Sequence, residues 1–183
     1  WSKNMYNLNT KRARCEEEGE IEWISGSFGS HVGYLYPMSV LAGRKSRSSF
    51  TGITFAGTGQ NLDTGCKVVL GAPDTTATVE TQSITRGGGI STFRSSIVAT
   101  PAAEGSAASV SCQSLMLDDI SRSDTIPAMD IRAKNVDIGH EATIGRIGDD
   151  KIFYLMSRGI SEEEARTMIV NGFAHPVSME LPL

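Results

Sequence analysis

Apolar and polar residues alternate in short runs along the first 148 residues of this chain. An alternation with a period of two places successive side chains on opposite faces of a β-strand. Gly, Asp, Asn, Ser or Pro bounds each run, as is typical of turns between strands. The runs are 21–23, 32–36, 50–55, 66–70, 77–81, 93–98, 109–115 and 129–131. The pattern therefore predicts a mainly β domain.

The spacing of these runs narrows the architecture. They recur roughly every 10–19 residues with no helical pattern between them, which leaves an antiparallel sandwich or barrel, or a β-solenoid. Within the first 148 residues there is no Asn-Gly or Asp-Gly dipeptide, the usual sign of tight hairpins. The turns are instead loose and rich in small residues, as in 86–89 and 102–106. These features favour stacked coils, although no strict hexapeptide or nonapeptide repeat is present.

The pattern changes near residue 149, so we divide the chain into a β core, 1–148, and a helical segment, 149–183. A first helix is predicted over 151–158, with Asp149-Asp150 as its cap and Gly159 as its end. Ser161 and Glu164 form a capping-box pattern that opens a second helix.

The second helix is expected to end at Gly172. Its apolar residues lie on one face at helical spacing, and they need a partner in the β core or in another chain. These residues are Ala165, Met168, Ile169 and Phe173.

Composition excludes several classes of protein. The formal net charge of −4 argues against nucleic-acid binding, and no run approaches the ~20 apolar residues of a membrane span. The three cysteines are far apart with no CxxC, which excludes a disulfide framework or a zinc finger and favours a reduced, cytoplasmic setting. Because the chain begins at Trp1 without a methionine, we expect a segment of a longer protein.

Candidate chemistry is sparse. His140 and Glu141 follow residues 133–138, which read as solvent-facing β structure. On a regular strand the two side chains would face opposite ways, so they are either a surface pair in a turn or a metal site at a bulge or strand end. Cys66 and Cys112 read as buried strand residues, and Cys15, before three glutamates, as exposed.

Familiar enzyme motifs are missing from the sequence. Residues 11–14 read as the solvated face of a strand. The glycines at 87–89 lack the Lys-Ser/Thr of a phosphate-binding loop, and no GxSxG motif supports hydrolase chemistry.

Four long stretches resemble the SufB/SufD family of SUF iron–sulfur cluster assembly proteins, and its SufB branch more than its SufD branch. The likeness covers nearly the whole chain. The stretches are "MYNLNTKRARC" (5–15), "FAGTGQNLDTGCKVV" (55–69), "CQSLMLDDISRSDTIPAMDI" (112–131) and "GHEATIGRIGDDKIFYLMSRGISEEEARTMIVNGF" (139–173).

The resemblance implies a right-handed parallel β-helix with a C-terminal helical region that docks on SufC, an ABC-type ATPase. It implies pairing with SufD, or with a second SufB copy, through the C-terminal end of the β-helix. Sulfur would come from a cysteine desulfurase and its carrier. The protein would be a non-enzymatic scaffold that holds a transient iron–sulfur cluster, with ATP hydrolysis left to the partner.

Site residues carry over by position. Cys112 matches a cluster ligand and sulfur acceptor, Glu141 an acidic residue that helps to bind iron, and His140 its neighbour. Lys11 and Trp1 match residues on the sulfur route. Gly139 departs from the family, which often has an acidic residue there.

Two alternatives remain beside the scaffold. One is a SufD-like module that dimerises and recruits the ATPase without binding a cluster. The other is a β-helix lyase or transferase, for which the sequence offers little beyond residues 11–14 and 118–119.

Overall fold

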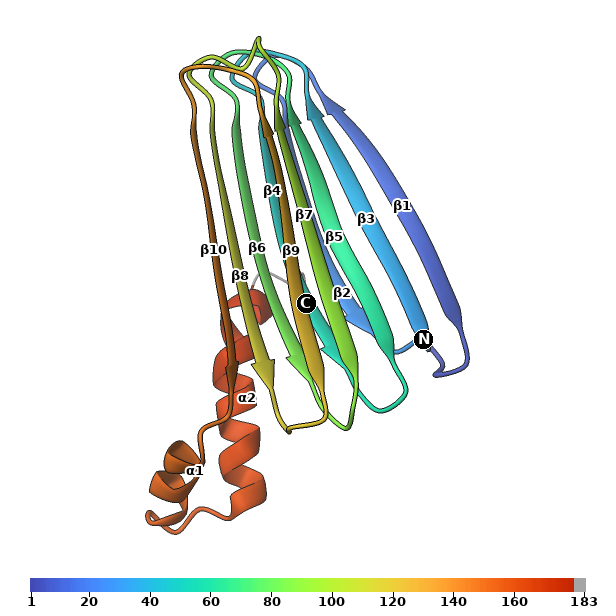
Figure 1. Cartoon of the computed structure of the whole chain (residues 1–183), viewed down its shortest axis with the longest axis vertical. Helices are drawn as coiled ribbons and strands as arrows, with labels where there is room; N and C mark the ends of the chain where they lie inside the picture. The colour runs from blue at the N-terminus through green and yellow to red at the C-terminus, as the bar shows by residue number, and fades with distance from the viewer. Residues whose placement is uncertain (180–183) are drawn as a thin grey trace.

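A computed structural model describes residues 1–179, in which ten strands precede two helices (Figure 1). The strands are β1 (Tyr6–Cys15), β2 (Glu20–Phe28), β3 (Val32–Leu41), β4 (Arg47–Ala56), β5 (Asn61–Leu70), β6 (Thr76–Thr85), β7 (Ile90–Ala99), β8 (Ala107–Met116), β9 (Arg122–Ile131) and β10 (Asp137–Arg146). The helices are α1 (Asp149–Met156) and α2 (Glu162–Ser178).

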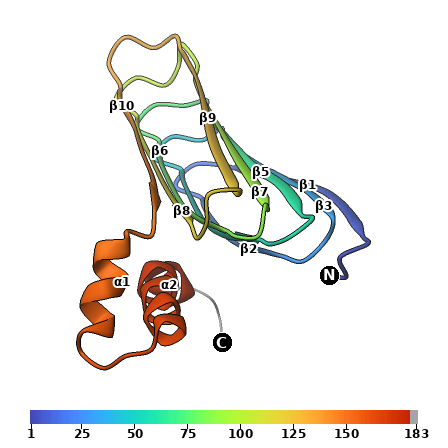
Figure 2. The same ribbon diagram turned by 60° about the horizontal axis from the view of Figure 1, so that its bottom comes forward.

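The strands form two parallel sheets that the chain visits alternately. The odd sheet has the order β1-β3-β5-β7-β9, and the even sheet the order β10-β8-β6-β4-β2. With two strands per turn, the chain winds through about five turns of a β-helix, whose coils are seen more nearly end-on in Figure 2. The predicted β-solenoid is therefore confirmed, and the antiparallel sandwich and barrel are excluded.

A repeat hidden in the sequence underlies this winding. Val32 pairs with Asn61 and Asn61 with Ile90, which are steps of 29 residues. The step is only 26 residues from Tyr6 to Val32 and reaches 32 from Ile90 to Arg122. Because strand length is nearly constant and turn length varies, no fixed sequence period appears.

The predicted runs all fall inside strands β2 to β9. The basic stretch 11–14 lies in β1, and 137–138 begin β10, so both solvent-facing stretches are also strands. The inward side chains mix apolar and small polar residues. Leu41, Leu70 and Val79 are fully buried, while the Ser48 hydroxyl donates a hydrogen bond to the buried Ser39 hydroxyl at 2.8 Å. Pairing of this kind satisfies hydroxyls of a serine-rich core, although within the described residues the Thr85 and Thr100 hydroxyls are buried without a hydrogen-bond partner.

The first helix differs from its prediction at both ends. α1 begins at Asp149, with Gly148 as N-cap and no side-chain cap. Asp149 and Asp150 therefore lie in the first turn, where their charge favours the positive end of the helix dipole, and they do not cap the helix. The helix ends at Met156, and Gly159 follows with φ +86°, a left-handed conformation suited to glycine.

The second helix begins as predicted and ends later. Ser161 and Glu164 make both hydrogen bonds of the capping box. The expected stop at Gly172 is wrong, because α2 continues to Ser178 and includes Pro176. Glycine inside a helix costs only about 1 kcal/mol relative to alanine, and burial of Val177 beyond it outweighs that cost.

α2 lies outside the coil and contacts β4 and β6 on the outer face of the even sheet (Figure 2). Ile53 and Ile84, which point outward on these strands, are almost fully buried there. Ala165 is fully buried, whereas Met168 remains about half exposed. The apolar face of α2 thus has the β core as its partner. No helix within residues 1–179 is long and apolar enough to span a membrane.

Candidate functional site

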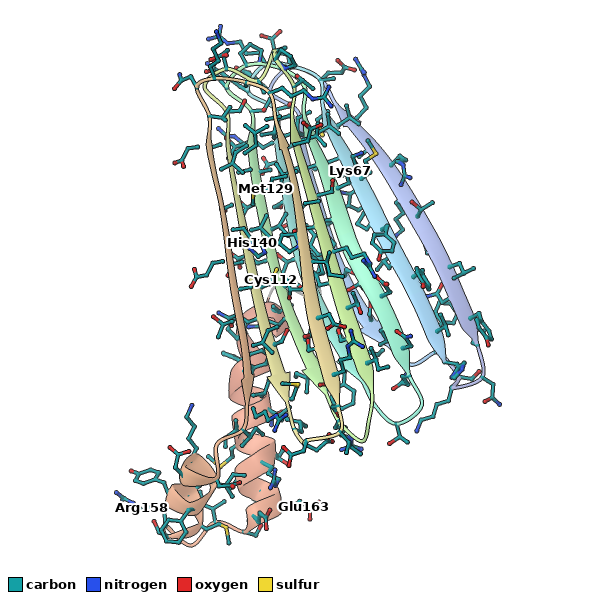
Figure 3. The ribbon with its side chains drawn as sticks, in the orientation of Figure 1. Lys67, Cys112, Met129, His140, Arg158 and Glu163 are labelled. Carbon is teal, nitrogen blue, oxygen red and sulfur yellow. The ribbon has the colours of Figure 1, made fainter. Side chains whose placement is uncertain are left out.

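Cys112 and His140 meet near the last turn of the β-helix. They lie on the neighbouring strands β8 and β10, and the Cys112 Sγ is 3.8 Å from the His140 Nε2 (Figure 3). His140 pairs with the buried Val110, so its ring points toward the interior, as the Cys112 thiol does. Neighbouring residues of parallel strands share a face, which is why a separation of 28 residues in sequence becomes a contact.

Glu141 is placed differently. It follows His140 on a strand whose pairing with β8 is unbroken from Asp137 to Arg146, so no bulge rotates its side chain. Glu141 therefore points to the outer face and is exposed. The structure brings Cys112 and His140 together and leaves Glu141 on the opposite face of the strand. Within residues 1–179 no group of three or more His, Cys, Asp or Glu side chains is arranged to hold a metal ion.

Burial controls the chemistry of the interior thiols. Loss of solvent raises the pKa of Cys112 to about 12. Burial, with a smaller contribution from Cys112, raises the pKa of Cys66 on β5 to about 12. Both groups are thus protonated thiols at neutral pH. A positive charge or a bound metal ion would be needed to stabilise the thiolate of Cys112.

Cys66 and Cys15 are both buried, which confirms one prediction and overturns another. Cys66 is a core residue, as predicted, and it lies in the interior near Cys112. Cys15 was expected to be exposed but is only 6% exposed. It pairs with the fully buried Leu41, and only the glutamates after it reach solvent. The alternation that places Ala13 inward also places Cys15 inward, so the sequence pattern already indicated a buried Cys15.

Lys11 and Trp1 lie at the other end of the coil stack. β1, which carries Lys11, is the first strand of the odd sheet, whereas β8 and β10 end the even sheet. Lys11 pairs with the buried Pro37, so it belongs to an inward-facing row, although the edge position leaves it exposed. Trp1 precedes β1 and is 73% exposed. The structure therefore does not bring these two residues to Cys112.

Two further surfaces were not predicted residue by residue. β9 and β10 are terminal strands, each paired on one side only, and they expose Ile126, Met129, Ile131 and Ile144. The helical hairpin, which lies to one side of the strands (Figure 3), exposes Phe153, Tyr154, Met156 and Met168. Unpaired strand edges and clustered apolar side chains are features of surfaces that receive another chain.

Comparison with known proteins gives one consistent result. Residues 1–173 match the family model described as "SUF system FeS cluster assembly, SufBD core domain". Over its whole length the chain is 44% identical to an iron–sulfur cluster assembly SufBD family protein of Mycobacterium bovis, and the match covers 22% of that protein. It is 43% identical to the iron–sulfur cluster assembly protein SufB of Bacillus subtilis, of which the match covers 39%. A SufBD family protein of Staphylococcus haemolyticus is 42% identical, with 39% of it covered. The chain spans well under half the length of these relatives.

Proposed function

Because the chain belongs to the SufBD core-domain family of iron–sulfur cluster assembly proteins, we propose that it is the part of a SufB-type scaffold that accepts iron and sulfur and holds a nascent cluster. The observation that carries this proposal is the contact between the Cys112 thiol and the His140 ring at 3.8 Å. Thiolate and imidazole both bind iron, and thiolate is the usual ligand of iron–sulfur clusters.

The scarcity of thiols suits a cluster that must be passed on. Cys112 would supply one strong ligand, and His140 a weaker, replaceable one beside it. The high pKa of Cys112 keeps its thiol protonated until iron or a persulfide donor arrives, and metal binding then releases the thiol proton. Glu141 faces outward, so it would bind iron in the same centre only after β10 shifts or turns.

The interior of the β-helix supports a route for sulfur. Lys11 pairs with Pro37 in the inward row. On the next strand Pro37 lies opposite Cys66, as the flanking pairs Leu35–Thr64 and Met38–Lys67 require. Cys66 in turn lies near Cys112. We assign Lys11 and Trp1 to the entrance of this route, with a cysteine desulfurase and its carrier as the source of sulfur.

The two exposed surfaces fit the partners that the family implies. The apolar hairpin surface would dock a SufC-type ABC ATPase, which would carry out ATP hydrolysis in place of this chain. The open edge formed by β9 and β10 would pair with SufD or with a second copy. Assembly would then take place in the cytoplasm, with residues 1–148 as the core and 149–183 as the docking segment. Residues 180–183 of that segment lie outside the described residues.

Anaerobic reconstitution of the full-length protein with its partner subunits tests the proposal. Iron and sulfide are quantified for wild type, Cys112→Ser and Glu141→Ala. Cys15→Ser serves as the matched control, because it alters a buried thiol of the same core on the opposite edge strand. We expect Cys112→Ser to lose the cluster and the control to keep it. A Lys11→Ala arm should accept sulfur more slowly than wild type, and an unchanged rate removes Lys11 from the route.

A SufD-like adaptor is the second candidate function. The observation in its favour is the absence of a three-residue metal cluster within residues 1–179. Equal iron and sulfide in wild type, Cys112→Ser and Glu141→Ala would support the adaptor and reject the scaffold.

A further inference from the structure

A groove on the odd sheet lies away from Cys112 and His140, which belong to the even sheet, although Cys66 of the proposed sulfur route is among its lining residues. Its volume is about 240 Å³, and it crosses β1, β3, β5 and β7. Cations, an aromatic ring and a thioether gather in it. The residues that matter here are Arg12, Tyr36, Met38, Lys67, Arg94 and Ser96.

Gly65 makes room for the Tyr36 ring that lines this groove. A side chain at this position would place its Cβ 2.1 Å from the carbonyl oxygen of Arg94 and 2.7 Å from the Tyr36 ring. The glycine therefore allows the Tyr36 ring to lie against the sheet, which is a recognised reason for glycine inside a strand. The ring is held as one apolar wall.

Asp63 fixes the orientation of two groove residues. The Arg94 Nε donates to Asp63 Oδ1 at 3.1 Å, and its Nη2 donates to Oδ2 at 3.1 Å. The Tyr36 hydroxyl also donates to Asp63, whose side chain is only 10% exposed. This bidentate arrangement holds the guanidinium rigidly and leaves its Nη1 for a ligand.

The other two cations, Arg12 and Lys67, make no ion pair with the described part of the chain. Lys67 makes no hydrogen bond or ion pair with the described part of the chain; its charge is felt at Asp130, whose pKa is lowered mainly by Arg132 and also by Lys67. Arg12 is in register with Met38, and Met38 with Lys67, so the three form one row across the groove. Arg12 is anchored through Nη1, which donates to the Thr10 hydroxyl and to the carbonyls of Lys11 at 3.0 Å and Tyr36 at 3.3 Å. Asp63 balances one of the three charges, and the groove keeps an excess of positive charge.

We propose that this groove binds a small organic phosphate. Arg12, Lys67 and Arg94 provide donors for a phosphate dianion, and the Tyr36 ring with Met38 provides an apolar surface for the carbon skeleton. The small volume and the net charge of −4 of the chain argue against a nucleic acid. The phosphate donors are separate from the proposed cluster ligands, because Cys112 and His140 belong to the even sheet.

Calorimetric titration of the full-length protein at constant ionic strength tests this site. The probes are phenyl phosphate and inorganic phosphate, applied to wild type, Lys67→Gln and Arg47→Gln. Arg47 is exposed on β4 of the even sheet, so its variant is a control for loss of one positive charge elsewhere. We expect Lys67→Gln to weaken phenyl phosphate binding about tenfold, the worth of one charge-assisted hydrogen bond, and Arg47→Gln to have little effect.

Several results would overturn the proposal. They are the lack of saturable phenyl phosphate binding to wild type, or equal weakening in Lys67→Gln and Arg47→Gln. Equal affinity for phenyl phosphate and inorganic phosphate would overturn the assignment to an organic ligand. Lys67 is exposed on its strand, so its variant should fold normally, which circular dichroism checks. Arg94→Gln would leave Asp63 buried without its ion pair, and it is therefore not used.

Discussion

At the scale of single residues, placement inside or outside the coil decides what each side chain can do. His140 and Glu141 are adjacent in sequence, yet one contacts the Cys112 thiol and the other faces solvent. Cys66 and Cys112 come from opposite sheets and share the interior. Neighbours in sequence therefore lie on opposite faces of a strand, whereas the winding of the chain brings residues that are distant in sequence together.

The buried thiols predict a dependence of stability on pH. The folded pKa of Cys66 is about 12, above the ordinary thiol value of 9.0, so folding favours the protonated thiol. Its stabilising effect is complete below pH 9 and is lost as pH rises toward 12. Between these limits the free energy of unfolding of wild type should fall by up to about 1.4 kcal/mol per pH unit more than that of Cys66→Ala. Urea unfolding at pH 8, 9 and 10 measures both slopes, and parallel slopes would contradict the stated burial.

At the scale of elements, α2 joins the two parts of the chain. One face of the helix packs on β4 and β6, and its first turns hold α1 away from the strands. α1 in turn exposes Phe153, which is 73% exposed, beside Tyr154 and Met156. A helix whose apolar side chains are exposed while its neighbour is packed is well placed to dock a partner.

The proposed docking role of α1 predicts that binding and stability can be separated. Phe153→Ser should strongly reduce co-purification of the SufC-type ATPase with the full-length protein. The melting temperature should change little, since the ring buries little surface in the free chain. Ile120→Ser is the matched control, because Ile120 is 75% exposed in the turn between β8 and β9. Equal retention of the ATPase by both variants would remove α1 from the interface.

At the scale of the whole molecule, an open β-helix has two ends. β1 and β2 border one end, and β9 and β10 border the other. Each terminal strand offers unpaired backbone groups, which native proteins cover or pair. At the β9 end, Ile131 continues the inward row of Leu70 and Ala99, so a partner strand added there would bury it.

The proposed pairing at this end predicts that a charge introduced there prevents dimer formation. Ile131→Lys would place an ammonium group in the joint between two β-helices, where its desolvation is costly. The full-length variant should fail to form the dimer with SufD or with itself, as sedimentation velocity would show. Ile120→Lys, outside the strands, should dimerise normally. A dimer that tolerates the lysine at residue 131 must be joined elsewhere.

The sequence by itself determined the local structure. Alternation located the strands from β2 to β9, and the capping box at Ser161 located the start of α2, because these signals depend on neighbouring residues alone. Family likeness identified the β-helix and the candidate residues. The stop at Gly172 and the exposure of Cys15 were wrong, since distant strands supply the packing that extends α2 and covers the thiol.

Only the tertiary structure decided which residues meet. The step between paired strands varies from 26 to 32 residues, so the register that joins Cys112 to His140 cannot be counted from sequence. The same register assembles Tyr36, Asp63 and Arg94 from three strands. The physical reason is that hydrogen bonds between successive coils hold a β-helix together. The loops between strands can change in length without changing the strands themselves.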